Sequence, residues 1–374
     1  LGFQLTVWQI SLIALIGGLL GVLFSFMLRR EMLEVEKLPC PDGQAAADLI
    51  NAGDEGGEKI KWLGGSFAVG ALLALARDKL ALVPVVFDLR SVNEGVAKFF
   101  PLSFLISLVP LAGGFLIGPL FTGAWFLGAL ATYFVLSPLI PSFGWGIASD
   151  AVVPAFSQPL GAGIVLGAAI AYFLWKGLPV LARVSSAWKE SGSKGSGSKK
   201  WLGVSVIVAV GLLTLVLDLN PVLSVLAVAG AFLMSFVAAR VTGEMNVDPL
   251  EIFALIIMLA AKLFLGVSAL PLIVLSAVVA IAAGMAGDMM QDLKTGQVLG
   301  TKPEQQLIAQ VVGAVVSALV IGFIIVALNQ AHGFGSAPLF APQAVTLKNI
   351  VSAANANVLI AGIVFGAIAF VLLE

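Results

Sequence analysis

The sequence has very little cysteine, histidine and charge for its 374 residues. Its single cysteine, Cys40, excludes a disulfide framework and a cysteine-built metal site, and its single histidine, His332, excludes a histidine-rich metal centre. Charged residues make up only 11%, and 20 Lys and Arg residues nearly balance 21 Asp and Glu residues. A nucleic-acid partner is therefore not expected, because such a protein needs a basic surface. We expect no resident cofactor or metal.

The familiar enzyme motifs are also missing from this sequence. It contains no Walker A sequence, no HExxH pair of zinc ligands and no GxSxG nucleophile elbow. The chain is therefore not expected to be an enzyme or an ATP-driven pump. Any solute that it moves would cross passively or be driven by an ion gradient.

Hydrophobic residues, in contrast, make up 60% of the sequence, with a mean hydropathy of +1.07. Average soluble domains are roughly 45–50% apolar and about 25% charged, so this composition indicates a membrane protein. Apolar runs of about 20 residues suit transmembrane helices. They predict an all-α polytopic bundle of about eleven spans at roughly 5–28, 62–77, 100–118, 120–140, 160–182, 201–219, 222–240, 250–265, 267–286, 306–328 and 349–373.

Two further segments, 79–98 and 141–159, mix apolar residues with charge, proline or glycine. They are interpreted as re-entrant or interfacial, since irregular backbone at membrane depth must be lined by protein or water. Within the second of them, Asp150 is a candidate gate or substrate contact.

The basic residues predict the orientation of the chain. With alternating spans, most Lys and Arg residues fall on one side, which predicts that loops 29–61, 183–200 and 287–305 are cytoplasmic in a multi-pass plasma-membrane protein. Loop 183–200 is rich in Gly, Ser and Lys, a composition typical of a flexible linker. It divides the chain into an N-terminal transmembrane half, 1–182, and a C-terminal half, 201–374.

Polar residues next to spans are the candidate functional residues, because they are costly in a membrane unless paired or used. In the first such group, Pro39 and Pro41 break the helix that leaves the first span, and Pro41 can begin a new one. The new helix N-terminus, with Asp42, Gly43 and Gln44, would suit a substrate carboxylate. An ordinary cytoplasmic loop with a capped helix is the alternative.

The second group follows a span that ends in small residues. Asp288 and Asp292 are spaced i,i+4, so on a continuing helix they share a face and disfavour joint ionisation. One of them is a candidate proton-coupling or gating acid, with Gln291 beside it and Lys294 as the charge partner. A solvated, charge-balanced turn is the alternative. Residues 301–304 then resemble a capping box that begins the next span.

The third group, residues 240–249, links two spans and contains Glu244, Asn246 and Asp248. These oxygen-rich side chains could bind a cation or the amine of a peptide. A plain polar turn explains the same residues equally well.

Taken in order, these groups resemble the oligopeptide transporter (OPT) superfamily, which includes the yellow stripe-like carriers. The most specific match is GDMMQDLKTGQVLGTKPEQQLIAQVVGA (287–314), which is similar to the family's Gly-Asp-Leu-Met-Gln-Asp-Leu/Phe-Lys-Thr-Gly signature. Residues 28–50, 238–250 and 341–344 resemble its Leu-Pro-x-Pro, Gly-Glu…Asn-Pro and Ala-Pro-Gln-Ala elements. Gln44 departs from the pattern, since the family usually has threonine there.

The resemblance implies secondary active transport of small oligopeptides or peptide-like compounds, coupled to protons. Metal–chelate transport is the alternative within the superfamily, and a non-transporting membrane scaffold is the alternative of another class. The expected partners are thus the substrate, protons and the lipid bilayer, with homo-oligomers left open. Compared with the family, the sequence begins at about the third span and lacks the closing pair of spans. We therefore expect either a reduced member or an incomplete chain.

Overall fold

The computed structural model describes most of the chain. The described residues are 5–88, 103–144, 147, 152–172, 174–175, 178–179, 196–248, 250, 253–254, 257–258, 261, 267–334 and 356–373.

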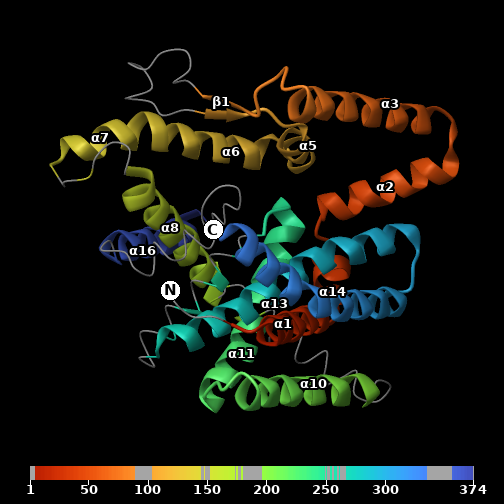
Figure 1. Ribbon diagram of the computed structural model, residues 1–374, viewed down its shortest axis with the longest axis vertical. Coiled ribbons are helices and arrows are strands. Elements are labelled where there is room, and N and C mark those ends of the chain that lie inside the picture. The colour runs from red at the N-terminus through yellow and green to blue at the C-terminus, as the bar shows by residue number, and fades with distance from the viewer. Residues whose placement is uncertain are drawn as a thin grey trace. The chain divides into compact units, whose positions relative to one another are not determined.

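Helices dominate these residues (Figure 1). The α-helices are α1 (Val7–Arg29), α2 (Pro41–Glu55), α3 (Gly57–Ala74), α5 (Leu108–Ile117), α6 (Pro119–Leu130), α7 (Ser137–Ser142), α8 (Gln158–Tyr172), α10 (Ser196–Leu215), α11 (Pro221–Met245), α13 (Ala269–Leu299), α14 (Pro303–His332) and α16 (Ala356–Leu373). Short π-helical turns continue some of them, at Arg30–Val35, Leu75–Lys79, Ala131–Leu136 and Val153–Ser157.

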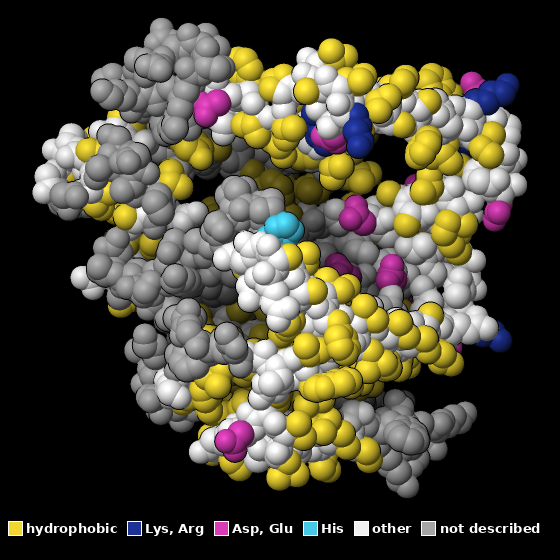
Figure 2. Space-filling model, in the orientation of Figure 1, with side chains coloured by type: hydrophobic (Ala, Val, Ile, Leu, Met, Phe, Trp, Pro, Cys, Tyr) yellow, Lys and Arg dark blue, Asp and Glu magenta, His cyan; other side chains and the backbone are white. Residues whose placement is uncertain are grey.

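Several of these helices are long enough to cross a membrane, whose hydrocarbon core is about 30 Å thick. Among the described residues, seven helical stretches are both long and apolar enough, including Val7–Val35, Pro221–Met245, Leu270–Leu299 and Pro303–His332. In Figure 2, hydrophobic side chains cover much of the face that α14 presents. The predicted all-α, multi-pass membrane architecture is therefore confirmed.

The predicted span 100–118 differs from the structure. Its described part contains a strand, β2 (Ser103–Leu105), and then only the ten residues of α5. The strand pairs antiparallel with β1 (Val86–Asp88), which falls within segment 79–98, and Phe87 lies opposite Phe104. Ten helical residues rise only about 15 Å, so α5 is too short to be a full span.

Most of segment 287–305, predicted to be a cytoplasmic loop between spans, is helical. α13 continues without a break to Leu299 and ends only where Gly300 adopts a left-handed conformation (φ 73°). Charged residues ended the apolar run in the sequence, but Asp, Gln and Lys are compatible with a helix. The capping box is also absent: Lys302, without a side-chain cap, precedes Pro303, and the Thr301 amide instead donates to the Gly296 carbonyl (2.8 Å).

The described chain forms two compact units, residues 44–161 and residues 1–43 with 162–374. In the second of these, α13 packs along α11 and α1, and α1 also packs on α14 and α10. Two buried hydroxyl groups also stabilise the packing of α1 and α11 on α13. Ser25 and Ser235 donate hydrogen bonds to the carbonyls of Ala286 and Ala282, respectively, both at 3.1 Å. The core of this unit is a three-helix contact centred on α13.

A second close contact in the same unit joins α8 and α16. Gly163 and Gly167 on α8 face the backbone of α16, where Gly362 and Gly366 have the same spacing. A Cβ atom at Gly167 would overlap the carbonyl oxygen of Ile363. Small residues four apart allow two membrane helices to approach closely, which is what this pair does.

The predicted linker 183–200 is described only at its end. Residues 196–200 are helical and form the first turn of α10 rather than flexible chain. The proposed division into halves at this linker stays a prediction.

Candidate functional site

The proline-rich break after the first span is present as predicted. The chain leaves its π-helical turn at Val35, and α2 begins at Pro41. Between them, Lys37 and Cys40 take left-handed backbone conformations (φ 56° and 45°), which turn the chain sharply. The Cys40 amide donates to the Gly243 carbonyl at 2.8 Å, so this turn is fastened to the end of α11.

Gln291 joins the three polar groups that the sequence singled out. Its Oε1 accepts the amide of Gly43 at 2.9 Å, while its Nε2 donates to the Thr242 carbonyl at 2.8 Å and to Asn246 Oδ1 at 3.2 Å. The residue is buried, and all its partners come from other segments. One side chain on α13 thus holds the first turn of α2 and the last turn of α11 in place.

The first turn of α2 lies directly on α13, and this contact requires glycine. A Cβ atom at Gly43 would overlap the Gln291 carbonyl oxygen and lie 2.9 Å from Lys294 Cβ. The Thr295 hydroxyl is 2.9 Å from the Gly43 carbonyl and 3.1 Å from the Gln291 carbonyl, so it can donate to either. The close backbone contact at Gly43 and the Thr295 hydroxyl therefore both hold the first turn of α2 against α13.

Asp288 and Asp292 lie on one exposed face of α13, as the i,i+4 spacing predicted for a continuing helix. Asp42, at the start of α2, is also exposed and close enough to interact electrostatically with Asp288, as Asp292 does. Three ionised carboxylates in one place repel one another. A bound proton or an ammonium group would relieve that repulsion.

The two acids of α13 differ in their partners. The amide of Gln310 on α14 donates to Asp292 Oδ2, and the amide of Gln306 donates to the Asp292 carbonyl at 2.6 Å. Asp288, within the described part of the chain, makes no hydrogen bond or ion pair. Asp292 is therefore braced against α14, whereas the Asp288 carboxylate has only like charges beside it.

Lys294, the predicted charge partner of these acids, does not contact them in the structure. Lys294 is two and six residues from them, so on the continuous helix it projects from a different face. No ion pair joins it to Asp288 or Asp292 among the described residues. Its charge acts instead on the Cys40 thiol, and its Cβ lies against the first turn of α2.

The end of α11 holds the residues predicted to bind a cation or an amine. Glu244 Oε1 pairs with Arg240 Nη2 at 2.9 Å, and Arg240 also pairs with Glu36 and lies 5.3 Å from the centre of the Tyr172 ring. Asn246 caps the helix in a left-handed conformation and is engaged by Gln291. A direct role of Glu244 and Asn246 in binding stays a prediction, and Asp150 lies outside the described residues.

Cys40 is buried in this region beside Gly243. Burial raises the pKa of its thiol to about 11, although the nearby Lys294 charge acts in the opposite direction. The thiol is therefore protonated and inert at neutral pH. Among the described residues, no group of three or more His, Cys, Asp or Glu side chains could hold a metal ion.

Sequence reasoning missed Thr242, Thr295 and Gln310, each of which fixes part of the site. Thr295 had a readable signal, since it lies one helical turn after Gln291. The contribution of Gln310 depends on how α13 and α14 pack, which spacing along one helix does not reveal.

A comparison with known protein families explains why the three polar groups of the sequence occur together in one chain. The model of the family described as OPT oligopeptide transporter protein matches residues 1–374. The chain belongs to this OPT family. The resemblance that its motifs carried is thereby confirmed, and membership of a family of transporters fits the expectation that the chain is not an enzyme.

Two relatives extend the comparison. A protein of Haemophilus influenzae, described as a candidate oligopeptide transporter, is 28% identical over 409 residues, covering 92% of this chain and 64% of that protein. A protein of Saccharomyces cerevisiae with the same kind of description is 31% identical over 146 residues, covering 38% of this chain and 20% of its own. The chain thus spans less than two thirds of the length of either OPT relative.

Proposed function

We propose that this OPT protein is a secondary active transporter of small oligopeptides or peptide-like compounds, driven by protons. The family and its relatives support the transport of peptides. The candidate site supports proton coupling, because it gathers exposed carboxylates beside a buried polar hub where helices meet. Broken helices that meet at such a place commonly form transporter sites.

The observation that carries the proposal is the different surroundings of Asp288 and Asp292. Asp292 is tied to α14 through Gln310, so we assign it the role of a brace. Asp288 faces only the carboxylates of Asp42 and Asp292, so its charge is the one that a proton would best neutralise. We therefore assign proton coupling to Asp288.

The same geometry favours the amino end of a peptide over its carboxylate. Pro41 has no N–H, and the N–H of Gly43 is taken by Gln291, so the first turn of α2 has few donors left for an anion. Asp42 and Asp288, in contrast, would attract an ammonium group. We propose that these two carboxylates receive the peptide amine, a proton or each in turn.

Two matched variants test the assignment. In proteoliposomes supplied with a labelled tripeptide on the outside, Asp288→Asn should abolish the stimulation of uptake by an inwardly directed proton gradient (acidic outside), because the coupling acid is neutralised. Exchange of the external label against internal unlabelled peptide, without a gradient, should persist. Asp292→Asn should keep the stimulation and lower the thermal stability of the protein, since the brace to α14 is weakened. Unchanged gradient-driven uptake by Asp288→Asn would remove it from proton coupling.

The other readings give different results in the same assay. A metal–chelate carrier would take up a labelled iron chelate and ignore tri- to pentapeptides. A non-transporting scaffold would take up neither under any gradient, although circular dichroism would show an intact helical fold.

A further inference from the structure

The first turn of α2 is attached to α13 by hydrogen bonds that have replacements. Gly43 donates its amide to Gln291 Oε1 at 2.9 Å, and the Thr295 hydroxyl lies 2.9 Å from the Gly43 carbonyl. The same hydroxyl lies 3.1 Å from the Gln291 carbonyl on its own helix. When the turn lifts from α13, Thr295 therefore keeps a hydrogen bond, and the Gly43 amide can bond to water, as amides in the first turn of a helix commonly do.

The residues on either side of this contact are held independently of it. Gln291 Nε2 donates to the Thr242 carbonyl at 2.8 Å, a bond to α11 that does not involve α2. The turn before α2 is also fastened to α11, since the Cys40 amide donates to the Gly243 carbonyl. Lifting of the first turn of α2 would therefore pivot at Pro41, while Cys40 stays buried.

Like charges oppose the contact. Asp288 lies one helical turn before Gln291, so the turn that bonds to Gln291 also brings Asp42 towards Asp288. The charges that act on the Asp288 side chain are both negative, namely Asp292 on the same helix and Asp42 on α2. When both are ionised, Asp42 and Asp288 push the first turn of α2 away from α13.

The other groups along this stretch of α13 leave that repulsion in place. Lys294 projects from another face of the helix, Asp248 adds a further carboxylate, and α14 contributes the neutral amide of Gln310. Within the part of the chain that the structure describes, no Lys or Arg forms an ion pair with Asp42 or Asp288. Neutralisation of the pair therefore has to come from a bound proton or cation.

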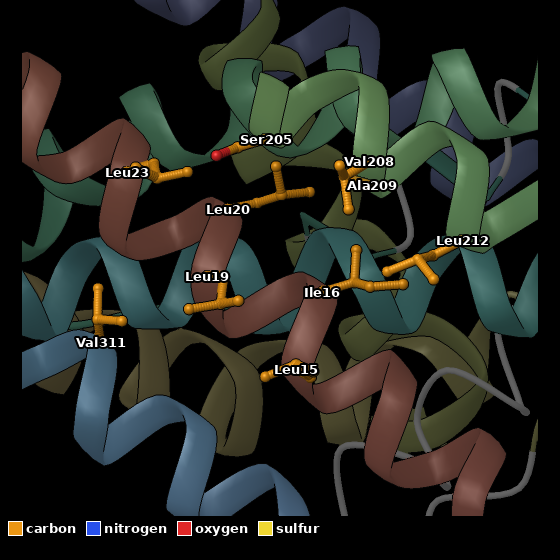
Figure 3. Close-up of a pocket in the computed structure, with 10 residues that line it drawn as sticks. All are labelled: Leu15, Ile16, Leu19, Leu20, Leu23, Ser205, Val208, Ala209, Leu212 and Val311. Carbon is orange, nitrogen blue, oxygen red and sulfur yellow. The ribbon is translucent and has the colours of Figure 1, made fainter. Parts of the chain in front are cut away.

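The neighbouring contact of α14 has no such repulsion. Gln310 holds Asp292, and the next residue, Val311, packs against the hydrophobic core. Val311 also lines an apolar pocket together with Leu19 and Leu23 of α1 (Figure 3). Apolar packing thus secures α14 at this site, whereas the attachment of α2 depends on charge.

We propose that the first turn of α2, residues 41–43, is a latch that docks on α13 when a proton or an ammonium group neutralises the Asp42–Asp288 pair, and detaches when both carboxylates are charged. The latch rests on the proposed function, because it gives the coupling acid a moving part to act on. Gly43 is also the last residue of one compact unit, and α2 continues from it into the other. The charge of Asp288 would thereby act on the helix that connects the two units.

Hydrogen–deuterium exchange of residues 42–46, measured by mass spectrometry on the purified protein at one neutral pH, reports how often the latch opens. Asp288→Asn should slow this exchange about fivefold, the ratio that corresponds to about 1 kcal/mol of repulsion between two charges near water. In an Asp42→Asn background the same substitution should have little effect, because the repulsion is already gone. Asp54→Asn, near the far end of α2, is the control and should leave exchange unchanged.

A pair of glycine variants tests the docking surface. Gly43→Ala places a methyl group against the Gln291 carbonyl oxygen, so the latch should stay open, exchange should be faster, and Asp288→Asn should no longer slow it. Gly53→Ala, on the same helix but with no described atom within 4 Å, should behave like the wild type.

Equal exchange in the wild type and Asp288→Asn would overturn the latch, because the contact would then be permanent. An equal effect of Asp288→Asn with and without Asp42 would overturn the role of this pair. The measurement uses neither peptide nor gradient, so its result is independent of the uptake assays. Failure of peptide uptake would count against the proposed function and leave the exchange result standing.

Discussion

Gln291 uses both ends of its side-chain amide on other segments of the chain. It accepts from the first turn of α2 and donates to the last turn of α11, from a buried position on α13. Removing such a side chain leaves a buried N–H and a buried C=O without partners, which costs more than the lost hydrogen bonds alone. Polar side chains therefore determine how these apolar helices meet at the site.

Gln291→Ala should destabilise the protein by roughly 1–3 kcal/mol, because the Gly43 amide and the Thr242 carbonyl lose their partner. Gln297→Ala, on an exposed position of the same helix, is the matched control and should have little effect. Thermal unfolding in detergent would measure both. Equal melting temperatures for the two variants would contradict the hub role of Gln291.

The buried thiol of Cys40 leads to a second prediction about a single residue. The sequence has no other cysteine, so a thiol reagent can label the protein only at this position. Its pKa of about 11 predicts almost no labelling by a maleimide at pH 7 in the folded protein, and full labelling after denaturation. Since the folded pKa is raised above the usual 9.0, stability from the neutral thiol is present below about pH 9 and is lost towards pH 11. Rapid labelling of folded protein at pH 7 would contradict this burial.

At the scale of secondary-structure elements, the sequence predicted where a helix occurs more reliably than where that helix ends. Long apolar runs correctly indicated several of the spans, and Pro41 correctly indicated the start of α2. The predicted span ended at residue 286, because hydropathy falls there, whereas α13 continues to Leu299. Charge marks where the apolar surface changes rather than where backbone hydrogen bonding stops.

The close contact between α8 and α16 leads to a prediction about how these two helices pack. Gly167→Ala should destabilise the protein by roughly 1–3 kcal/mol, because the new methyl group overlaps the Ile363 carbonyl and the helices must separate. Gly161→Ala, also on α8 but with no described atom within 4 Å, should be neutral or stabilising by up to about 1 kcal/mol. Thermal unfolding of both variants would check this, and a smaller loss for Gly167→Ala than for Gly161→Ala would contradict it.

The site itself could be predicted only in part, for a physical reason. Spacing along one helix placed Asp288 and Asp292 on one face, and the structure agrees. It could not show that Gln310 brings α14 to Asp292, or that the charge of Lys294 acts on the Cys40 thiol. Those contacts depend on packing between helices that lie far apart in the sequence.

At the scale of the whole molecule, this multi-pass OPT protein gathers its proposed coupling residues around the polar hub at Gln291. Because the proposed coupling acid, Asp288, lies on the same helix as this hub, we expect transport to depend on the pH gradient.

The most direct test of the central claim is uptake of a labelled tripeptide into proteoliposomes that contain the purified protein. We expect an inwardly directed proton gradient (acidic outside) to drive accumulation of the peptide above its external concentration, and a protonophore to abolish this accumulation. Uptake that only equilibrates the peptide, or no uptake from a correctly folded protein under the same gradient, would contradict proton-driven transport.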